Sequence, residues 1–189
     1  MNDSAIAIMD AAERRMRTGG FNGFSFREIA ADVGVKSSSV HYHFPTKEAL
    51  AAAVIRRYTE DVAELIERGF ETETDPVRVW TRAFRGTTFS ENRICPCAVL
   101  GAASRDLPPE VATEVKAFFK MCLDKLVERG LSGDGASELL SIITGAMVVA
   151  NALDDLSHYD RATRELMRER EALNAKRRKQ KPSAKSRRA

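Results

Sequence analysis

Two short helical segments joined by a tight turn, within residues 25–47, constrain the fold of this chain more than any other feature. Ser25 is followed three residues later by Glu28, which is the pattern of a capping box and predicts a helix that begins at Phe26. Gly34 is expected to end that helix, because glycine readily adopts the left-handed conformation of a helix C-terminus. The chain is therefore predicted to turn there and to begin a second short helix.

The second helix, over about residues 36–44, presents a polar face. Pro45 stops it, because proline disfavours helical geometry in the residue before it. Val40 and Phe44 are four residues apart and are expected to pack inward. The side chains left outward or at the edges are Ser37, Ser38, Ser39, His41, Tyr42 and His43. Small donors and rings of this kind suit phosphates and base edges, so the pattern predicts a helix that reads DNA.

The same part of the chain carries a longer series of motifs. In order they are Ile8, Asp10-Ala-Ala-Glu13, Gly20-Phe21, Phe26-Arg-Glu-Ile-Ala30, Gly34-Val35 and His43-Phe-Pro-Thr-Lys-Glu-Ala-Leu50. Their order and spacing resemble the N-terminal domain of TetR-type transcriptional regulators. His41 departs from the pattern, since the family most often has a phosphate-contacting tyrosine there, although an imidazole can donate to the same phosphate.

The resemblance implies an all-α fold with an N-terminal three-helix helix-turn-helix DNA-binding domain, followed by a helical ligand-binding and dimerisation domain. The expected bounds are residues 1–50 and 51–175, with a basic tail over 176–189. It also implies a homodimeric repressor that a small-molecule effector releases from a palindromic double-stranded DNA operator. The expected DNA contacts are Arg27, Ser37, Ser38, Ser39, His41, Tyr42, His43, Thr46 and Lys47. No enzymatic activity and no cofactor are expected.

Apolar residues recur at spacings of three or four along most of the chain and predict helices almost everywhere, with no convincing strand. Besides the pair described above, the expected helices cover about residues 4–18, 46–68, 75–89, 96–104, 108–129, 134–154 and 157–175. In the family that the chain resembles, the helix over 46–68 links the DNA domain to the rest, and its tilt transmits the ligand signal.

The segment Leu139–Leu153 is apolar nearly all round its expected helix, so it must be buried on more than one face. Ser141, Gly145 and Val149 fall four residues apart and form a smooth stripe that lets another backbone approach closely. The side chains expected to face the subunit's own core are Leu140, Ile143 and Met147. The stripe predicts a dimer interface, as the resemblance also implies. The alternative is the central helix of a monomeric bundle.

Several apolar and aromatic side chains on separate helices are candidates for an interior effector cavity. They are Trp80, Phe84, Cys97, Phe118, Met121, Cys122, Met147 and Asn151. An apolar pocket with few polar groups is typical of a small-ligand site. Aromatic and Met residues at helical spacing also form plain core, which is the alternative interpretation.

Cys95-Pro96-Cys97 opens one of the expected helices, where a thiol can have a lowered pKa. The run is similar to the start of a ligand-domain helix in some TetR-type subgroups. This implies an alternative function, a thiol-based redox or electrophile-sensing regulator that uses Cys97 or Cys95. The structural alternative is that Cys97 is a small buried hydrophobe. Zinc is not expected, because CxC is not the usual CxxC spacing.

Two remote alternatives lie outside DNA binding. One is a helical thiol enzyme in which Cys97 is the nucleophile, served by His158 and by Asp154 or Asp155. No local signature supports it, and no phosphate loop, dinucleotide motif or paired-histidine metalloprotease motif is present. The other is a helical interaction module that no longer binds DNA. Salt-dependent binding to a palindromic duplex separates the regulator from both.

Composition is ordinary for a soluble globular protein, with 43% hydrophobic and 30% charged residues. No uninterrupted apolar run approaches the roughly eighteen residues that span a bilayer, and Met1-Asn-Asp-Ser4 lacks a signal core, so no membrane association is expected and the expected location is the cytoplasm. Eight Lys or Arg and no acid lie between residues 176 and 188, so the rest of the chain carries about −5. Such a tail has a disordered composition and either attracts DNA without sequence preference or only adds solubility.

Overall fold

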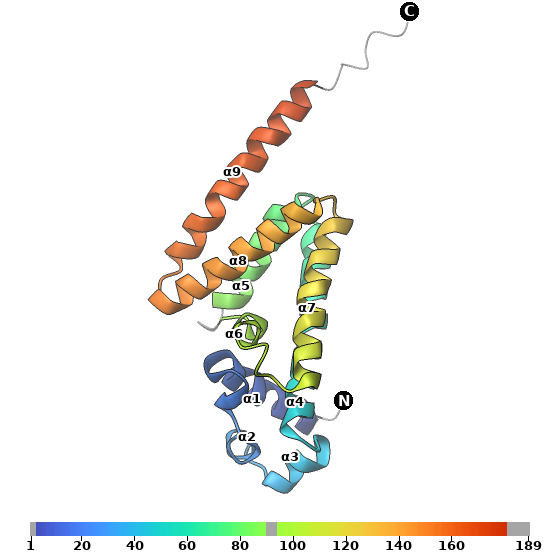
Figure 1. Ribbon diagram of the computed structural model, residues 1–189, viewed down its shortest axis with the longest axis vertical. Coiled ribbons are helices and arrows are strands. Elements are labelled where there is room, and N and C mark those ends of the chain that lie inside the picture. Colours follow the sequence, from blue (N-terminus) through green and yellow to red (C-terminus); the bar gives the residue numbers. More distant parts are fainter. Residues whose placement is uncertain (1–2, 90–93, 181–189) are drawn as a thin grey trace, which may run out of the picture.

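The computed structural model describes the backbone of residues 3–89 and 94–180, and the side chains of residues 3–86 and 94–168. All regular structure in these ranges is helical, so the expected all-α fold is confirmed. The helices are α1 (Asp3–Gly19), α2 (Phe26–Val33), α3 (Ser37–His43), α4 (Lys47–Phe70), α5 (Pro76–Phe89), α6 (Pro96–Ala102), α7 (Pro109–Glu128), α8 (Gly133–Leu153) and α9 (Ser157–Gln180), with a short 3-10 turn at Phe21–Gly23. Figure 1 shows an elongated molecule in which α1, α2 and α3 form one end.

The predicted capping box and glycine turn set the α2–α3 pair. The Ser25 hydroxyl accepts from the backbone N–H of Glu28 at 3.3 Å and donates to its carboxylate at 2.8 Å. Gly34 has a φ of 74°, in the left-handed region that favours glycine. The N–H of Val35 then donates to the carbonyl of Ala30 at 2.9 Å, which closes the turn. The turn ends at Val35, and α3 begins two residues later at Ser37.

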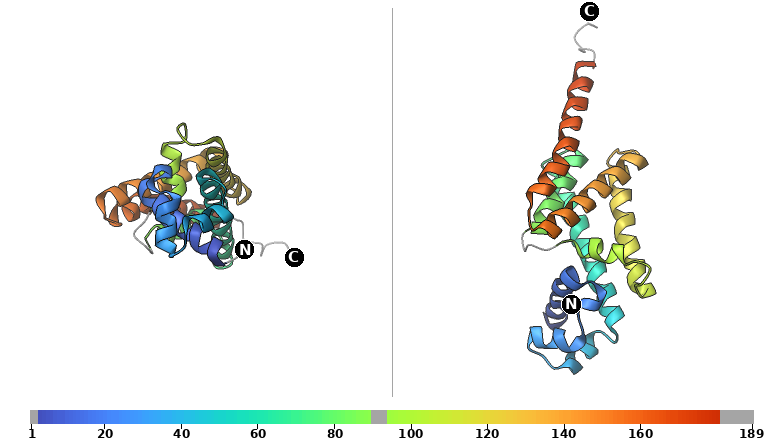
Figure 2. Two further views of the ribbon diagram at one scale, coloured as in Figure 1. Left: turned by 90° about the horizontal axis from the view of Figure 1, so that it is seen from below. Right: turned by 60° about the vertical axis from the view of Figure 1, so that its left-hand side comes forward.

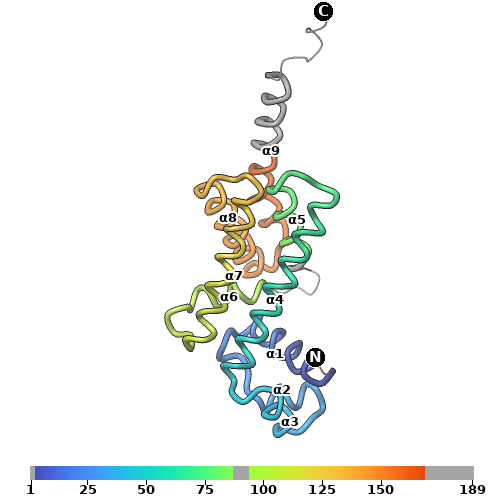
Figure 3. Tube along the Cα trace, turned by 90° about the vertical axis from the view of Figure 1, so that its right-hand side faces the viewer, coloured from blue at the N-terminus to red at the C-terminus, as the bar shows by residue number. Residues whose placement is uncertain are grey.

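The long helix α4 connects the two ends of the molecule. Thr46 caps its start, since its hydroxyl accepts from the N–H of Ala49 at 3.0 Å. Both α1 and α7 pack along it, and Figure 3 shows α4 passing from the α1–α3 end into the larger end. The expected domain boundary between residues 50 and 51 therefore lies inside an unbroken helix.

One continuous apolar core runs through both ends. Its largest buried side chains include Trp80, Phe84, Phe118 and Tyr159. The Tyr159 hydroxyl donates to the carbonyl of Thr81 at 2.9 Å, so the start of α9 is fixed against α5. Figure 2 shows α9 running on beyond this body, at the end of the molecule remote from α3.

The predicted helices agree with the observed ones to within two residues at each end, with one exception. The last helix continues to Gln180 instead of ending near residue 175, so residues 176–180 of the expected tail are helical. The rest of that tail, residues 181–189, lies outside the described residues.

Helix α8 bears on the expectation that no segment is apolar enough to span a membrane. Within the described ranges it is the helix long and apolar enough to cross a membrane by length and composition alone, with a mean hydropathy of 1.6. No uninterrupted apolar run marks this helix in the sequence, because Ser141, Thr144 and Gly145 interrupt the run. The mean hydropathy of the helix is nevertheless high. However, α8 packs against α5, α7 and α9, which is the arrangement of a core helix.

Candidate DNA-binding face and effector region

The outward face of α3 carries the side chains that were predicted to contact DNA. Tyr42 is 84% exposed, whereas Val40 beneath it is fully buried. His41 and Ser38 are also exposed, while Ser37, Ser39 and His43 are half-buried at the edges of the helix, and all belong to the small α1–α3 end in Figure 1. The buried valine fixes the rotation of α3, so its polar side chains face solvent together. Their DNA contacts stay a prediction.

Aromatic contacts hold two of the predicted contact residues in place. The His41 ring packs edge-on against Phe26, with 4.6 Å between centroids. The Lys47 ammonium lies over the rings of Phe21 and Phe24, 4.6 and 4.8 Å from their centroids. A cation held over two ring faces loses little further freedom when it meets a phosphate. Lys47 is thus positioned at the start of α4, and exposed Arg27 and Thr46 share the same end.

An ion-pair cluster fixes α1 to α2. The Arg15 guanidinium donates to both oxygens of the Asp32 carboxylate, at 2.6 and 3.0 Å, and to Glu28 at 3.2 Å. The hydrogen bond from Arg15 lowers the pKa of Asp32 below its usual value. Arg15 thus neutralises the carboxylates of Asp32 and Glu28, which lie on the helix that precedes α3. Unpaired, these carboxylates would repel the DNA that α3 is predicted to contact.

The expected effector residues lie in the packed core, with two exceptions. Trp80 stacks on Phe84 at 5.8 Å between centroids, and Phe118 packs against Tyr58 at 5.6 Å. The fully buried members are Trp80, Phe84, Cys97, Phe118, Cys122 and Met147. Met121 is half-buried. Asn151 is exposed, so its predicted interior position is wrong for the single subunit: it lies at the edge of the α8 face that buries Met147.

Three buried polar groups in this core have unusual surroundings. Trp80 Nε1 and Thr81 Oγ1 are buried without a hydrogen-bond partner. The Tyr58 hydroxyl is likewise buried without a hydrogen-bond partner, and the groups that act on it are Cys95, Cys97 and Arg17. A buried donor without a partner costs about 1–3 kcal/mol, so such groups are uncommon in plain core. Sequence periodicity cannot predict these unpartnered groups, because it indicates which side chains are buried and not which of their polar atoms form hydrogen bonds.

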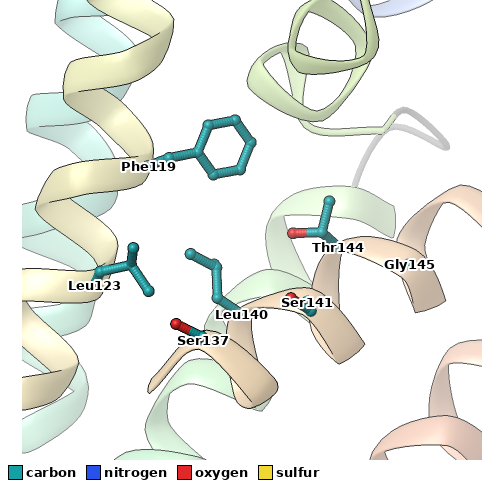
Figure 4. Close-up of a pocket in the computed structure, with 7 residues that line it drawn as sticks. All are labelled: Phe119, Leu123, Ser137, Leu140, Ser141, Thr144 and Gly145. Atoms are coloured by element: carbon teal, nitrogen blue, oxygen red, sulfur yellow. The ribbon is translucent and has the colours of Figure 1, made fainter. Parts of the chain in front are cut away.

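An open groove lies between α7 and α8, a feature that sequence reasoning missed. Its volume is about 420 Å³, and its lining side chains are shown in Figure 4: Phe119, Leu123, Ser137, Leu140, Ser141, Thr144 and Gly145. Apolar walls alternate with hydroxyls, and the lining has no charged side chain. The hydroxyl residues Ser137, Ser141 and Thr144 recur at spacings of four and three along α8, and this spacing could have indicated a polar-lined groove on that side of the helix. Ser141 and Gly145 of the predicted dimer stripe form part of its wall.

The start of α6 gathers the cysteines. Burial opposes ionisation of Cys95, but the neighbouring Cys97 thiol, Tyr58 hydroxyl and backbone N–H groups of Cys97 and Ala98 outweigh it and lower the pKa of Cys95 to about 7. Burial instead raises the pKa of Cys97 and of Cys122 well above the ordinary thiol value. Of the two cysteines that the sequence offered for thiol sensing, Cys95 is the one whose pKa is lowered.

The described residues give no support to the metal and thiol-enzyme alternatives. No group of three or more His, Cys, Asp or Glu in these ranges is arranged to hold a metal ion. His158 Nε2 lies 3.7 Å from the carboxylate of Asp155 at the start of α9. The titratable groups that act on Cys97 are Cys95, Cys122 and Arg17. His158 is not among them, so the structure does not bring the base of the thiol-enzyme alternative to Cys97, although it does place His158 beside Asp155.

Comparison with known proteins adds independent findings. Residues 8–54 match the family described as bacterial regulatory proteins, tetR family. Over 75 residues the chain is 33% identical to the HTH-type transcriptional regulator LmrA of Bacillus subtilis (strain 168), a match that covers 39% of this chain and 40% of that protein.

Two solved structures extend the likeness to most of the chain. A transcriptional regulator of the TetR family from Agrobacterium tumefaciens has a TM-score of 0.81 and 27% identity, covering 88% of this chain and 96% of that one. The multidrug binding protein EbrR complexed with proflavin has a TM-score of 0.60 and 21% identity, covering 88% and 99%. The second likeness is one of fold alone.

Proposed function

Residues 8–54 of this chain belong to the TetR family of bacterial regulatory proteins, and on that premise we propose that the whole protein is a DNA-binding transcriptional repressor under small-molecule control. The observation that carries the proposal is the outward face of α3, where Tyr42 is 84% exposed over the buried Val40. A short helix so oriented fits the major groove with its polar side chains toward base edges. Such a protein works in the cytoplasm, where the DNA is.

The proposed DNA contacts divide into two kinds. Tyr42, His41 and the serines of α3 face bases and adjoining phosphates, so they set sequence preference. Lys47, held on Phe21 and Phe24, and exposed Arg27 neutralise phosphates and set affinity. A single α3 spans few base pairs, so a palindromic operator and two subunits are required for tight binding.

The proposed dimer forms through the free face of α8. Val148, Val149 and Leu153 are between 45% and 57% exposed, which is unusual for large apolar side chains on one helix. Ser141 and Gly145 lie on the same side and are also exposed, while Leu140, Ile143 and Met147 are buried in the subunit, the division that the sequence predicted. Covering this face with a second copy removes apolar surface from water.

The proposed effector binds among the core residues that have unpartnered donors. Trp80 Nε1 and Thr81 Oγ1 lie on neighbouring residues of α5, next to the stacked ring of Phe84. A largely apolar molecule with a carbonyl or ether oxygen satisfies such donors. The dimer has a conformation in which the spacing of its two α3 helices fits the operator and one in which it does not. The effector lowers DNA affinity if it binds more tightly to the conformation that does not fit. We keep the division into a DNA-binding domain over residues 1–50 and an effector and dimerisation domain over residues 51–175 as part of this proposal. Helix α4 belongs to both domains.

Thiol sensing is a second candidate mode of control. It is supported by the three buried cysteines Cys95, Cys97 and Cys122, and by the lowered pKa of Cys95, to which the neighbouring Cys97 thiol and Tyr58 hydroxyl contribute. This mode uses the same DNA-binding face and replaces the bound molecule with a covalent change.

The test is binding of the full-length protein to a duplex selected from a random pool. The proposal expects a selected sequence with two-fold symmetry and an affinity that falls as salt rises. A protein that selects no sequence, and whose weak binding shows no preference, contradicts it.

A further inference from the structure

A hollow of about 320 Å³ lies where the last turns of α4 meet the first turns of α5. One face of each helix forms a wall of it. On α4, Leu65 and Arg68 are three residues apart, and on α5 the wall residues Val79, Arg82 and Ala83 fall at i, i+3 and i+4. The volume is within the range of small-ligand sites, which is about 300–1,000 Å³.

The floor of the hollow is apolar. Val79 is buried, and Leu65 and Ala83 are half-buried beside it. A Cβ atom added at Gly69 would lie 2.8 Å from Val79 Cγ1, so the missing side chain lets α5 pack closely on α4. This contact fixes the separation of the two walls, and the floor offers an apolar surface that the chain itself leaves uncovered.

The rim carries two guanidinium groups that the protein does not satisfy. Arg68 makes no hydrogen bond or ion pair with any residue that the structure describes. The side chain of Arg82 is 66% exposed, and its ion-pair partner Glu73 is 3.8 Å away, beyond hydrogen-bond distance. By contrast, Arg85 on the next turn of α5 donates to both oxygens of Asp160, at 2.7 and 3.0 Å. The rim thus has donors to spare for an anion.

The carboxylate among the lining residues does not cancel this charge. Glu73 is anchored by the backbone, since its Oε1 accepts the N–H groups of Thr74 and Asp75 at 2.9 and 3.1 Å. Its Oε2 lies 3.8 Å from Arg82 and 3.9 Å from Arg78. Two guanidinium groups against one carboxylate leave the rim positive.

We propose that this hollow binds an amphipathic organic anion, with its carboxylate between Arg68 and Arg82 and its alkyl chain on the apolar floor. Guanidinium groups match the two oxygens of a carboxylate. An ion pair at an exposed rim contributes little alone, so the chain has to cover the floor as well. The site does not rest on the proposed repressor function. It also uses a different face of α5 from Trp80 and Phe84, which stack in the core.

The experiment is calorimetric titration of the full-length protein with sodium octanoate. Acetate and 1-octanol are the matched probes, since they carry the headgroup alone and the chain alone. The expected result is one octanoate per chain, with acetate and octanol each at least about tenfold weaker. Arg68→Gln and Arg82→Gln should each weaken octanoate binding about tenfold and leave octanol binding unchanged, because each removes charge-assisted hydrogen bonds.

Two control variants separate this site from simpler explanations. Arg105→Gln removes an exposed positive charge between α6 and α7, and Thr81→Val changes the core side of α5. Both should bind octanoate as the parent does. A loss of affinity in Arg105→Gln equal to that in the rim variants would show attraction by net charge alone. An equal loss in Thr81→Val would place octanoate in the core, and either result overturns the proposal.

Four further outcomes would overturn it. They are octanol that binds as tightly as octanoate, acetate that binds as tightly as octanoate, parent-like octanoate affinity in both rim variants, and no octanoate binding up to about 10 mM. Failure of the protein to select a DNA sequence would remove the repressor function and leave these results unaffected.

Discussion

The guanidinium of Arg17 donates to the backbone carbonyl of Ile94 at 3.1 Å, although 77 residues separate them in the chain. This bond joins α1 of the DNA-binding end to the segment that leads into α6. The same helix α1 also packs against α2 and α3. A change at either end of the bond is therefore expected to alter the other.

The pH dependence of peroxide oxidation follows from the thiol pKa. The pKa of Cys95 is lowered to about 7, so its reactive thiolate is scarce at pH 5 and predominates above pH 7. The oxidation rate should rise through neutral pH and level off near pH 8, whereas the rate of an ordinary thiol, with a pKa of about 8.5, continues to rise well above pH 8.5. Mass spectrometry of samples quenched with an alkylating reagent measures the rate. A rate that keeps climbing past pH 9 contradicts the thiol-sensing mode of control through Cys95.

Lys47→Ala tests the phosphate contact. The ammonium over Phe21 and Phe24 is expected to neutralise one phosphate, so its loss should weaken binding to all sequences alike. The slope of log affinity against log salt should fall by about one. Lys116→Ala, exposed on α7, leaves the slope unchanged if the assignment holds. An unaltered slope for the Lys47 variant removes this residue from the interface.

Gly145→Glu tests the proposed dimer face. A Cβ atom added at Gly145 meets no neighbouring atom within 4 Å, and Gly145 is exposed, so the single subunit accommodates the change. In the dimer the same carboxylate becomes buried without a partner, which costs about 3–5 kcal/mol. Light scattering should show a folded monomer that binds half-sites only. Ala117→Glu on exposed α7 should stay dimeric, and a dimeric Gly145 variant would move the interface elsewhere.

Thr81→Val tests the effector proposal, because valine removes the hydroxyl but leaves no cavity in the core. The Thr81 hydroxyl is buried and unpartnered, so removing it should raise the free energy of unfolding by about 1 kcal/mol in urea. If an effector uses this donor, its affinity, read from Trp80 fluorescence, should fall about tenfold while ligand-free DNA binding is kept. Phe118→Ala is a poor probe, because truncating a ring that is 1% exposed costs about 3–5 kcal/mol of stability. Unchanged affinity in the Thr81 variant places the effector away from α5.

Local signals were enough to predict the helices. The Ser25–Glu28 box, Gly34 and Pro45 each act within four residues, and the structure has a helix boundary at each. Helical periodicity likewise separated the buried Met147 from the exposed Val149 on α8. Such signals fail for contacts between elements. The meeting of Arg17, Tyr58 and Cys95 needs three helices in place, and the groove between α7 and α8 depends on how far apart two helices pack.

The central claim, that the outward face of α3 reads DNA, is tested most directly by repeating the random-pool selection with Tyr42→Ala beside the parent protein. Tyr42 is 84% exposed and its ring contacts that of the neighbouring His43, so its removal should leave the fold intact. The account predicts that the variant still binds DNA with the parent's salt slope but selects a different or degenerate sequence within each half-site. Selection of the parent's sequence at the parent's affinity would show that α3 does not read it.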